Sequence, residues 1–256
     1  MSRREVQESM FPDVAPARPQ GFLMPSVFGG NNAELMAAVA PMYLTGSVLD
    51  VTYGKGKWWD RVTPEPFTAH DLFTLDGVDF RALPEADRSF DTVCFDPPYV
   101  SAGGDPTKGG VNLHESYGIG HKKMVALAPD ATNRTDRVEA LILAGLSECL
   151  RVARRFVLVK CMEYAQGHAA SSAYARVKLS RFHDVPHLVT CAALDAGWVK
   201  HDQIVHHSGS GPGGHNIFTA KRARRHHSYL IVFTRLDAWR GDSRGEVLDV
   251  DIVKEL

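Results

Sequence analysis

The chain has 256 residues, of which 44% are hydrophobic and 23% are charged, and its formal net charge is −1. A chain of this length can bury one substantial core, so we expect a single globular domain with insertions. The near-zero net charge excludes a global basic field, and any affinity for nucleic acid must come from local clusters of basic residues. The four cysteines lie apart, without a Cys-x-x-Cys spacing, which predicts neither disulfides nor a zinc site and favours a cytoplasmic location. No segment has the apolar length of a membrane span, so no membrane partner is expected.

The amino-terminal region is predicted to contain an arm followed by a helix. Residues 1–20 combine charges with prolines and show no periodicity, which indicates a flexible arm. Asn31 then precedes apolar residues at helical spacing over 33–40, and we expect it to cap a helix there.

A strand and a glycine turn follow at residues 48–56. Val48, Leu49 and Val51 indicate a buried strand, and the turn with Gly54 and Gly56 is expected to open a helix. Backbone N–H groups and a surface for close approach gather at such a strand end. The third glycine of the dinucleotide fingerprint is missing and a bulky tryptophan follows, which favours a nucleoside without phosphates over a pyrophosphate.

Two further strands are expected to end in acidic residues. The first covers residues 66–72, and its Asp71 lies 21 positions after Asp50, about the distance at which an acid in such folds accepts hydrogen bonds from ribose hydroxyls. A solvated loop aspartate is the alternative. The second candidate strand, 78–84, carries Asp79 and Phe80.

A short apolar run over residues 90–95 indicates another buried strand, which stops at Asp96, Pro97, Pro98 and Tyr99. Because the prolines remove two backbone donors, the carbonyls of Asp96 and Pro97 cannot be used by a continuing strand pair. A carboxylate, a stiff carbonyl and an aromatic face can accept hydrogen bonds from a planar amino group and stack on its ring. A nucleobase amine fits this description, whereas a plain strand-ending turn is the structural alternative.

The motif at residues 96–99 resembles the (Asp/Asn/Ser)-Pro-Pro-(Tyr/Phe) motif of the amino-methyltransferases that modify adenine or cytosine in DNA with S-adenosylmethionine. The segment from Asp50 to Gly56 is similar to the family's loop for the methionine end of the cofactor, with Thr52 and Tyr53 where many members have Pro-Phe. The resemblance covers about residues 28–233. It implies an α/β, Rossmann-like class I methyltransferase fold, a doubly wound, seven-stranded, mostly parallel sheet with an antiparallel last strand. No large recognition domain is evident, which departs from the family and argues against a long, stringent DNA site.

The resemblance also implies roles for individual residues. An acid at the place of Asp79 would accept from the adenine amine of the cofactor while Phe80 packs on the ring. The expected cofactor-binding residues are Phe28, Asn31, Asp50, Thr52, Tyr53, Gly54, Gly56, Asp71, Asp79 and Phe80. The expected catalytic residues are Asp96, Pro97, Pro98 and Tyr99.

The second half of the chain is predicted to alternate regular elements with insertions. Periodicity predicts a helix over 136–152, a buried strand over 155–162, a helix over 185–196 ended by a glycine, and a hairpin of 203–205 with 228–233. The methyltransferase domain is expected over 21–235, with a tail at 236–256 and recognition insertions near 100–135, 163–184 and 207–227. Basic residues in the first and last insertions are expected to contact DNA phosphates: Lys108, Lys122, Lys123, Lys221, Arg222, Arg224 and Arg225. Several histidines cluster near the end of the chain without a zinc pattern, so no metal is expected.

The predicted activity is methyl transfer from S-adenosylmethionine to the N6 amino group of adenine in DNA, with the base flipped out of the helix. Asp96 rather than serine at the first motif position favours adenine, and a cytosine-N4 enzyme is the first alternative. An RNA amino-methyltransferase, a non-catalytic nucleic-acid-binding protein and a nicotinamide-dependent enzyme are further alternatives. The sequence predicts no particular oligomeric state.

Overall fold

The computed structural model describes residues 24–97, 134–166, 181–207 and 227–236. Seven strands form one sheet in the order β1-β8-β9-β5-β4-β2-β3. These strands are β1 (Val27–Gly29), β2 (Val48–Asp50), β3 (Phe67–Ala69), β4 (Phe90–Phe95), β5 (Ala153–Cys161), β8 (Trp198–His207) and β9 (His227–Arg235). The helical elements are α2 (Asn32–Tyr43), the 3-10 turn η1 (Lys57–Trp59), α5 (Arg134–Val152) and α6 (Val185–Asp195).

The pairing of the strands confirms the predicted fold class. β2, β3, β4 and β5 pair parallel with one another, whereas β9 runs antiparallel between β5 and β8. This is the Rossmann-like, seven-stranded, mostly parallel sheet of the class I methyltransferase fold, with its last strand antiparallel. Because β5 and β8 both run opposite to β9, the carboxyl ends of all the other strands meet at one edge of the sheet.

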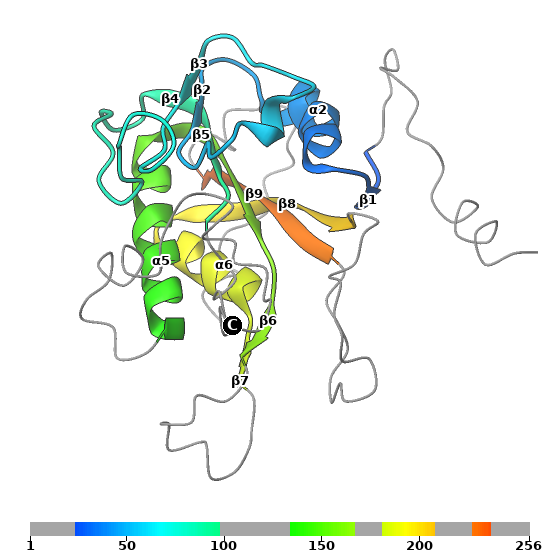
Figure 1. Ribbon diagram of the computed structural model, residues 1–256, viewed down its shortest axis with the longest axis vertical. Helices are drawn as coiled ribbons and strands as arrows, with labels where there is room; N and C mark the ends of the chain where they lie inside the picture. Colours follow the sequence, from blue (N-terminus) through cyan, green and yellow to red (C-terminus); the bar gives the residue numbers. More distant parts are fainter. Residues whose placement is uncertain (1–23, 98–133, 167–180, 208–226, 237–256) are drawn as a thin grey trace, which may run out of the picture.

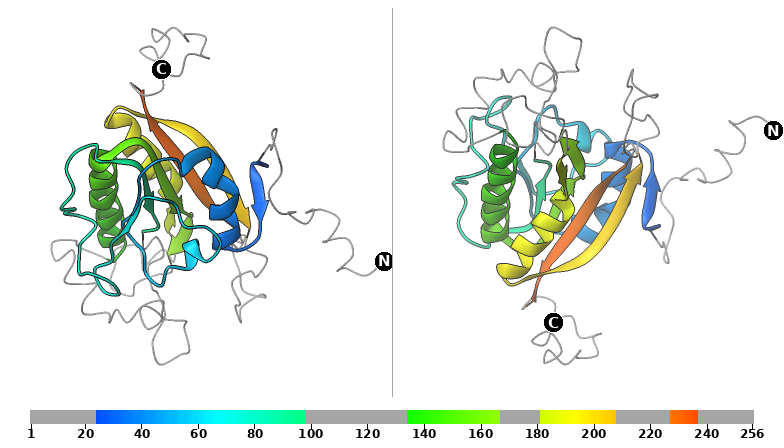
Figure 2. Two further views of the ribbon diagram at one scale, coloured as in Figure 1. Left: turned by 90° about the horizontal axis from the view of Figure 1, so that it is seen from above. Right: turned by 90° about the horizontal axis from the view of Figure 1, so that it is seen from below.

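Helices cover both faces of the sheet, as a doubly wound architecture requires (Figures 1 and 2). α2 packs on one face, where Met36 and Val39 join Leu158 and Val232 in one buried cluster. α5 and α6 pack on the other face, where Ile142 and Val189 join strand residues in a second cluster. The near-continuous apolar runs of β4 and β5 follow from this burial on both faces.

Most predicted elements are confirmed with small shifts of their ends. Asn31 caps α2 through a capping box, in which its side chain accepts from the N–H of Glu34 and the Glu34 carboxylate accepts from its backbone N–H. Gly197, with φ of 79°, follows α6 as expected of a helix-ending glycine. The hairpin of β8 with β9 is also present.

Two details of the prediction are wrong, and one strand of the sheet was not predicted. Residues 78–84 form turns and irregular backbone rather than a strand, because the carboxylate of Asp79 accepts from the N–H of Arg81 and its carbonyl from the N–H of Ala82. The glycine turn opens only the short η1 rather than an α-helix. The sheet still has seven strands because β1, which is too short to show a periodic pattern, pairs with β8 at the far edge.

A small two-stranded ribbon leaves the main sheet within the expected insertion at 163–184. β6 (Tyr164–Gln166) pairs antiparallel with β7 (Arg181–His183). The segment between these strands, like the arm at 1–20, the tail from 237 onward and most of the other two expected insertions, lies outside the described residues.

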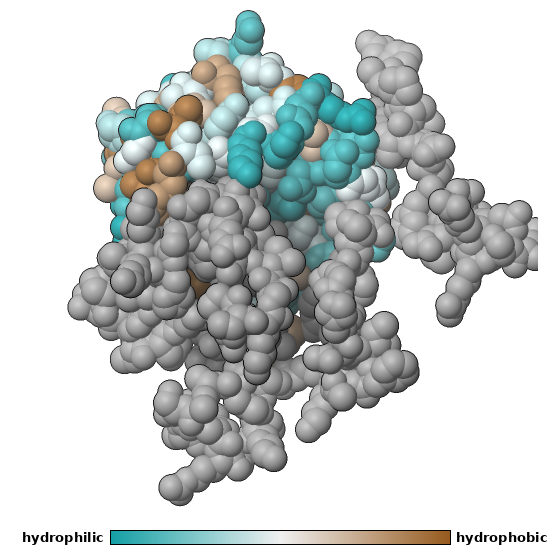
Figure 3. All heavy atoms as spheres, viewed as in Figure 1, coloured by the Kyte–Doolittle hydropathy of each residue, from teal (hydrophilic) through white to brown (hydrophobic). Residues whose placement is uncertain are grey.

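On the visible surface of the described part, hydrophilic residues gather on one side, and neutral and hydrophobic residues are mixed on the other (Figure 3). Its large exposed hydrophobic side chains belong to separate segments, namely Val27, Leu75, Phe182 and Leu194. Within the described ranges, no helix has the length and apolar character to cross a membrane.

Candidate active site at the carboxyl edge of the sheet

The predicted catalytic and cofactor segments meet at the carboxyl edge, on either side of the point where the strand order reverses. The chain passes from β2 outward to β3 and returns to β4, which lies on the opposite side of β2. In open α/β sheets, ligands bind in the crevice at such a point. The backbone N–H of Asp96, after β4, donates to the hydroxyl of Thr52, after β2, at 2.8 Å. The two predicted motifs are therefore directly joined.

Two consecutive tryptophans in η1 hold the two acids of the site. Trp59 donates from its indole N–H to Oδ2 of Asp50 at 2.7 Å. The side chain of Trp58 lies close enough to Asp96 to lower the pKa of that carboxyl. Both tryptophans are buried, and their ring centroids lie 6.4 Å apart. Sequence reasoning treated Trp58 only as an obstacle to phosphate binding, whereas the structure assigns both indoles to the support of the acids.

Asp50 lies beneath the glycine turn and shapes it. Its Oδ1 accepts from the N–H of Thr52 at 2.9 Å, so both carboxylate oxygens have partners within the protein. Burial raises the pKa of Asp50 to about 7, against the lowering effect of the hydrogen bonds from Thr52 and Trp59, and the charges of Asp96 and Asp71 raise it further. The edge thus concentrates three carboxylates, an arrangement that favours a positively charged ligand.

Asp96 retains an unused acceptor. Its Oδ1 is buried and has no hydrogen-bond partner among the residues that the structure describes. Burial raises the pKa of Asp96, whereas the charge of Lys160 and the hydrogen bond from Trp58 lower it. A buried acceptor without a partner is costly, and in native structures it marks a position that is completed by something else.

Lys160 is a site residue that the sequence did not reveal. It lies near the end of β5, next to β4, is 6% exposed, and donates from Nζ to the side-chain carbonyl of Asn32 at 2.8 Å. The residue is hidden within the apolar run of its strand. A lysine in a strand that is buried on both faces was the available signal.

The loop after β3 is tied to the glycine turn through Asp71. Its Oδ2 accepts from the N–H of Gly54 at 2.9 Å, and its Oδ1 accepts from the N–H groups of Phe73 and Thr74. The hydroxyl of Thr74 in turn donates to the carbonyl of Gly54 at 2.6 Å. Asp71 therefore lies beside the expected cofactor loop rather than in open solvent, and its contact with a ribose stays a prediction.

Asp79 and Phe80 have structural partners of their own. The carboxylate of Asp79 pairs with the guanidinium of Arg81, with 2.6 Å between Oδ2 and Nη2. Phe80 packs on Phe95 of β4, with centroids 5.4 Å apart, and on Gly145 of α5. Their predicted contacts with an adenine stay predictions.

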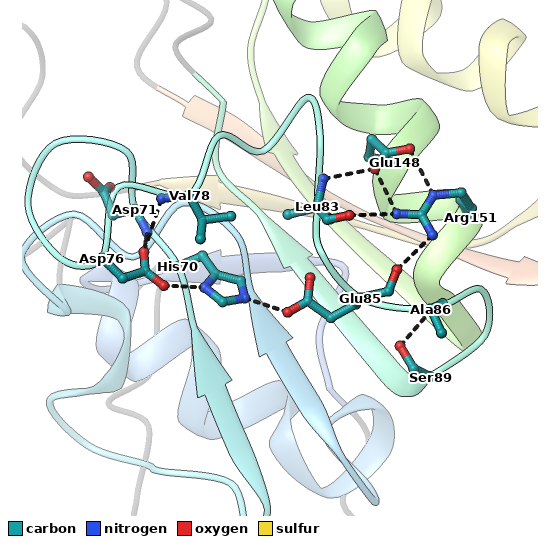
Figure 4. Close-up of polar contacts among 10 residues, drawn as sticks. All are labelled: His70, Asp71, Asp76, Val78, Leu83, Glu85, Ala86, Ser89, Glu148 and Arg151. Carbon is teal, nitrogen blue, oxygen red and sulfur yellow. Dashed lines mark hydrogen bonds and ion pairs between the residues drawn. The ribbon is translucent and has the colours of Figure 1, made fainter.

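His70, at the end of β3, lies between two carboxylates (Figure 4). Its Nδ1 lies 2.5 Å from Oδ2 of Asp76, and its Nε2 lies 2.6 Å from Oε1 of Glu85. Burial would lower the pKa of His70, but the hydrogen bonds and charges of Glu85 and Asp76 outweigh it and raise that pKa. The imidazolium form, which donates from both nitrogens, fits this geometry.

The same loop is anchored to α5. Arg151 donates to the carbonyls of Glu85 and Leu83, and Glu148 accepts from the N–H of Leu83 (Figure 4). The segment that carries Asp71, Asp79 and Phe80 is thus fixed at both of its ends.

On the other side of the site, β1 leads into α2. Phe28 is buried, and its ring centroid lies 6.3 Å from that of His206. Asn31 caps α2. The expected contacts of Phe28 and Asn31 with the cofactor stay predictions. His206 lies 2.9 Å from the carbonyl of Gly30, and burial together with the charge of Lys160 lowers the pKa of His206 to about 4. His206 is therefore neutral at neutral pH and donates to Gly30, which fixes the turn into α2.

The remaining predicted site residues lie outside the described residues. They are Pro98, Tyr99, Lys108, Lys122, Lys123, Lys221, Arg222, Arg224 and Arg225. The described ends of the last insertion are in place: His207 ends β8, His227 begins β9, and the two pair at the carboxyl edge. In the part of the chain that the structure describes, no three His, Cys, Asp or Glu side chains gather into a metal-binding group.

Comparisons with known proteins find similarity in structure only. No family model and no curated protein matches the chain. Among solved structures, a Haloferax volcanii protein in complex with the Trm112 methyltransferase activator is 13% identical, with 79% of this chain and 87% of that chain covered and a TM-score of 0.41. The Synechocystis PCC 6803 magnesium protoporphyrin IX methyltransferase with bound S-adenosylmethionine is 13% identical, with coverages of 80% and 77% and a TM-score of 0.40.

A Thermus thermophilus protein described as a DNA modification methylase, complexed with S-adenosyl-L-methionine, is 12% identical. The alignment covers 74% of this chain and 55% of that one, with a TM-score of 0.32. At these identities and TM-scores the similarities carry no weight for cofactor or substrate, which are argued below from the residues of the site.

Proposed function

We propose that this protein is an S-adenosylmethionine-dependent methyltransferase that modifies the N6 amino group of adenine in DNA. The observation that carries the proposal is the placement of Asp96. Its backbone is held by the Thr52 hydroxyl of the glycine turn, and its buried Oδ1 has no partner among the described residues. A hydrogen-bond acceptor for an amine thus lies next to the loop expected to hold the methyl donor.

The residues of the edge fit a positively charged nucleoside cofactor. Three acids, Asp50, Asp71 and Asp96, gather at this edge, and a positively charged ligand would favour the ionised forms of Asp50 and Asp96, whose pKa values are raised by burial. The Gly54 turn offers close backbone approach without a phosphate cradle. When bound, S-adenosylmethionine supplies an electrophilic methyl group on a sulfonium. In this proposal the turn at Thr52, Tyr53, Gly54 and Gly56 holds its methionine end, and Asp71 and Asp79 face its nucleoside.

The chemistry of the target amine assigns the catalytic roles. The lone pair of an exocyclic amine is delocalised into its ring, so the amine is a poor nucleophile until both of its hydrogens are bound by acceptors. The Asp96 carboxylate and the Pro97 carbonyl are the two acceptors. As the amine nitrogen takes the methyl group, the methyl carbon–sulfur bond breaks and S-adenosylhomocysteine is the leaving group. The nitrogen becomes positively charged, and one of its protons then passes to Asp96 or to water.

DNA is the proposed substrate because an amine within a duplex cannot be aligned with the cofactor, so the base must leave the helix. Tyr99 would stack on the flipped base, and the basic residues of the insertions would bind phosphates. Both insertions that carry these basic residues start or end at the carboxyl edge, since one follows Pro97 and the other connects His207 to His227.

The test uses purified protein with radiolabelled S-adenosylmethionine and either unmethylated duplex DNA or structured RNA. Label is expected in DNA, and digestion followed by mass spectrometry is expected to give N6-methyladenine. If digestion gives N4-methylcytosine and no N6-methyladenine, the target base is cytosine rather than adenine. If label appears in RNA alone, the substrate is RNA rather than DNA. Failure of the folded protein to bind S-adenosylhomocysteine would reject the proposed cofactor.

A further inference from the structure

The candidate site contains a buried positive charge as well as its acids. Lys160 is 6% exposed, and its one hydrogen bond within the described residues goes to the neutral amide of Asn32. Neither Lys160 nor Asp96 forms an ion pair with any residue that the structure describes, although Lys160 is close enough to lower the pKa of Asp96. An ammonium group buried without an anionic partner is unfavourable, so an anion that reaches it would be bound strongly.

The start of α2 lies next to this charge. Asn32 is the first residue of the helix, and its backbone N–H and that of Ala33 have no hydrogen-bond partner among the described residues. The two donors add the positive end of the helix dipole to the ammonium of Lys160. Asn31 and Glu34 already satisfy each other in the capping box, so the capping side chains do not occupy these donors.

No nearby group among the described residues forms an ion pair with Lys160, although the carboxyl of Asp96 is close enough for the two charges to interact. His206 lies close enough for Lys160 to lower its pKa, and it is uncharged at neutral pH. Asn32 supplies only an amide oxygen, which uses one of the three donors of the ammonium. Two donors of Lys160 and two backbone donors of α2 are therefore available to one small anionic group.

We infer that Lys160, with the first turn of α2, binds the carboxylate of the amino-acid end of the cofactor. This inference rests on the proposed function, because S-adenosylmethionine carries one carboxylate and no phosphate. Lys160 then has two effects: it anchors the cofactor's tail, and it favours the ionised form of Asp96. The carboxylates of Asp50 and Asp71 are hydrogen-bonded within the protein and act on the positively charged parts of the same ligand through their charge.

The test compares two ligands in two proteins by calorimetry. The ligands are S-adenosylhomocysteine and its decarboxylated form, in which hydrogen replaces the carboxylate. The wild-type protein is expected to prefer S-adenosylhomocysteine by about tenfold to hundredfold, the usual effect of charge-assisted hydrogen bonds. In Lys160→Met this preference is expected to fall to about threefold or less, because the charge that reads the carboxylate is gone.

Two further variants complete the experiment. Lys200→Met removes an exposed lysine of β8 and should leave the preference unchanged. Asn32→Asp has nearly the same shape as the wild type but pairs its own carboxylate with Lys160, so the preference should also be lost. Asn32→Asp keeps the inference testable if Lys160→Met does not fold.

The outcomes separate this inference from the proposed function. If folded Lys160→Met keeps the wild-type preference, or weakens both ligands equally, Lys160 does not bind the carboxylate, whereas the cofactor assignment stands. If folded wild-type protein binds neither ligand, the proposed function fails and the inference fails with it.

Discussion

The hydroxyl of Thr52 accepts a hydrogen bond of 2.8 Å from the backbone N–H of Asp96 and so joins the ends of β2 and β4. The same residue donates its own N–H to Asp50 at 2.9 Å. Thr52 therefore connects the acid beneath the glycine turn with the acid proposed to bind the target amine, and a change at Thr52 should affect both halves of the site.

Replacing Thr52 by valine keeps the shape of the side chain but leaves the N–H of Asp96 without its acceptor. An unsatisfied backbone donor that is shielded from water costs about 1–3 kcal/mol, and we expect a loss of this size in the free energy of unfolding. The methyl-transfer rate should fall about tenfold or more because Asp96 is no longer held in position. Chemical denaturation and initial rates measure the two effects. Thr52→Ser, which keeps the hydroxyl, is the control; equal rates in both variants would show that the bond does not position Asp96.

Asp96 should impose a pH dependence on methyl transfer. The acceptor role requires the carboxylate, and burial raises its pKa despite Lys160 and Trp58. The rate should therefore decline as the pH falls through a value above that of an ordinary aspartate, and Lys160→Met should shift this limb to higher pH because the lowering charge is removed.

Asp96→Asn should reduce the rate about a hundredfold or more while binding of S-adenosylhomocysteine persists. A wild-type rate that stays constant down to about pH 4 would contradict the assigned role.

His70 should make the stability of the protein depend on pH. Its pKa is raised in the folded state by Glu85 and Asp76, which outweigh burial. The stabilisation is therefore fully present below the unfolded value of about 6.5 and is lost as the pH rises through the folded value. Relative to wild type, His70→Gln should lose about 1.5–3 kcal/mol of unfolding free energy near pH 6, the usual value for hydrogen bonds to charged groups.

The comparison of His70→Gln with wild type needs unfolding curves at several pH values. The difference between the two proteins should shrink as the solution becomes alkaline. As a matched control, His187→Gln replaces a histidine of α6 that lies beside the thiol of Cys191 rather than between two carboxylates. A difference that is constant with pH would mean that His70 is not held as the imidazolium.

Sequence patterns predicted the parallel core of this fold because the strands β2, β4 and β5 are apolar runs that end in distinctive residues. The expected cofactor loop and catalytic motif also follow adjacent strands, because Asp50 is the last residue of β2 and Asp96 comes directly after β4. The prediction of a strand at 78–84 was wrong for a local reason. Asp79 binds the backbone and side chain of Arg81, and this turn competes with an extended backbone.

The contacts that complete the site were beyond sequence reasoning because they join distant segments. Lys160 meets Asn32 across 128 positions of the chain, and no local spacing encodes such a pair. The tryptophans of η1 resemble ordinary core residues in the sequence, which does not show that Trp59 donates to Asp50 or that Trp58 lowers the pKa of Asp96. Short edge strands such as β1 likewise depend on their partner rather than on their own pattern.

The glycine turn gives a prediction with a control inside the same protein. Gly56 and Gly77 both have positive φ, 69° and 79°, so alanine at either position should cost about 1–2 kcal/mol of unfolding free energy. A Cβ at Gly56 would lie 2.5 Å from the hydroxyl oxygen of Tyr53, whereas one at Gly77 would meet nothing within 4 Å. The side chain of Tyr53 must therefore move in Gly56→Ala, and Tyr53 is one of the residues proposed to hold the cofactor. We expect S-adenosylhomocysteine to bind Gly56→Ala at least tenfold more weakly and Gly77→Ala with wild-type affinity, as measured by calorimetry on folded protein. If both variants bind S-adenosylhomocysteine with equal affinity, Gly56→Ala affects the stability of the protein alone and this turn does not hold the cofactor.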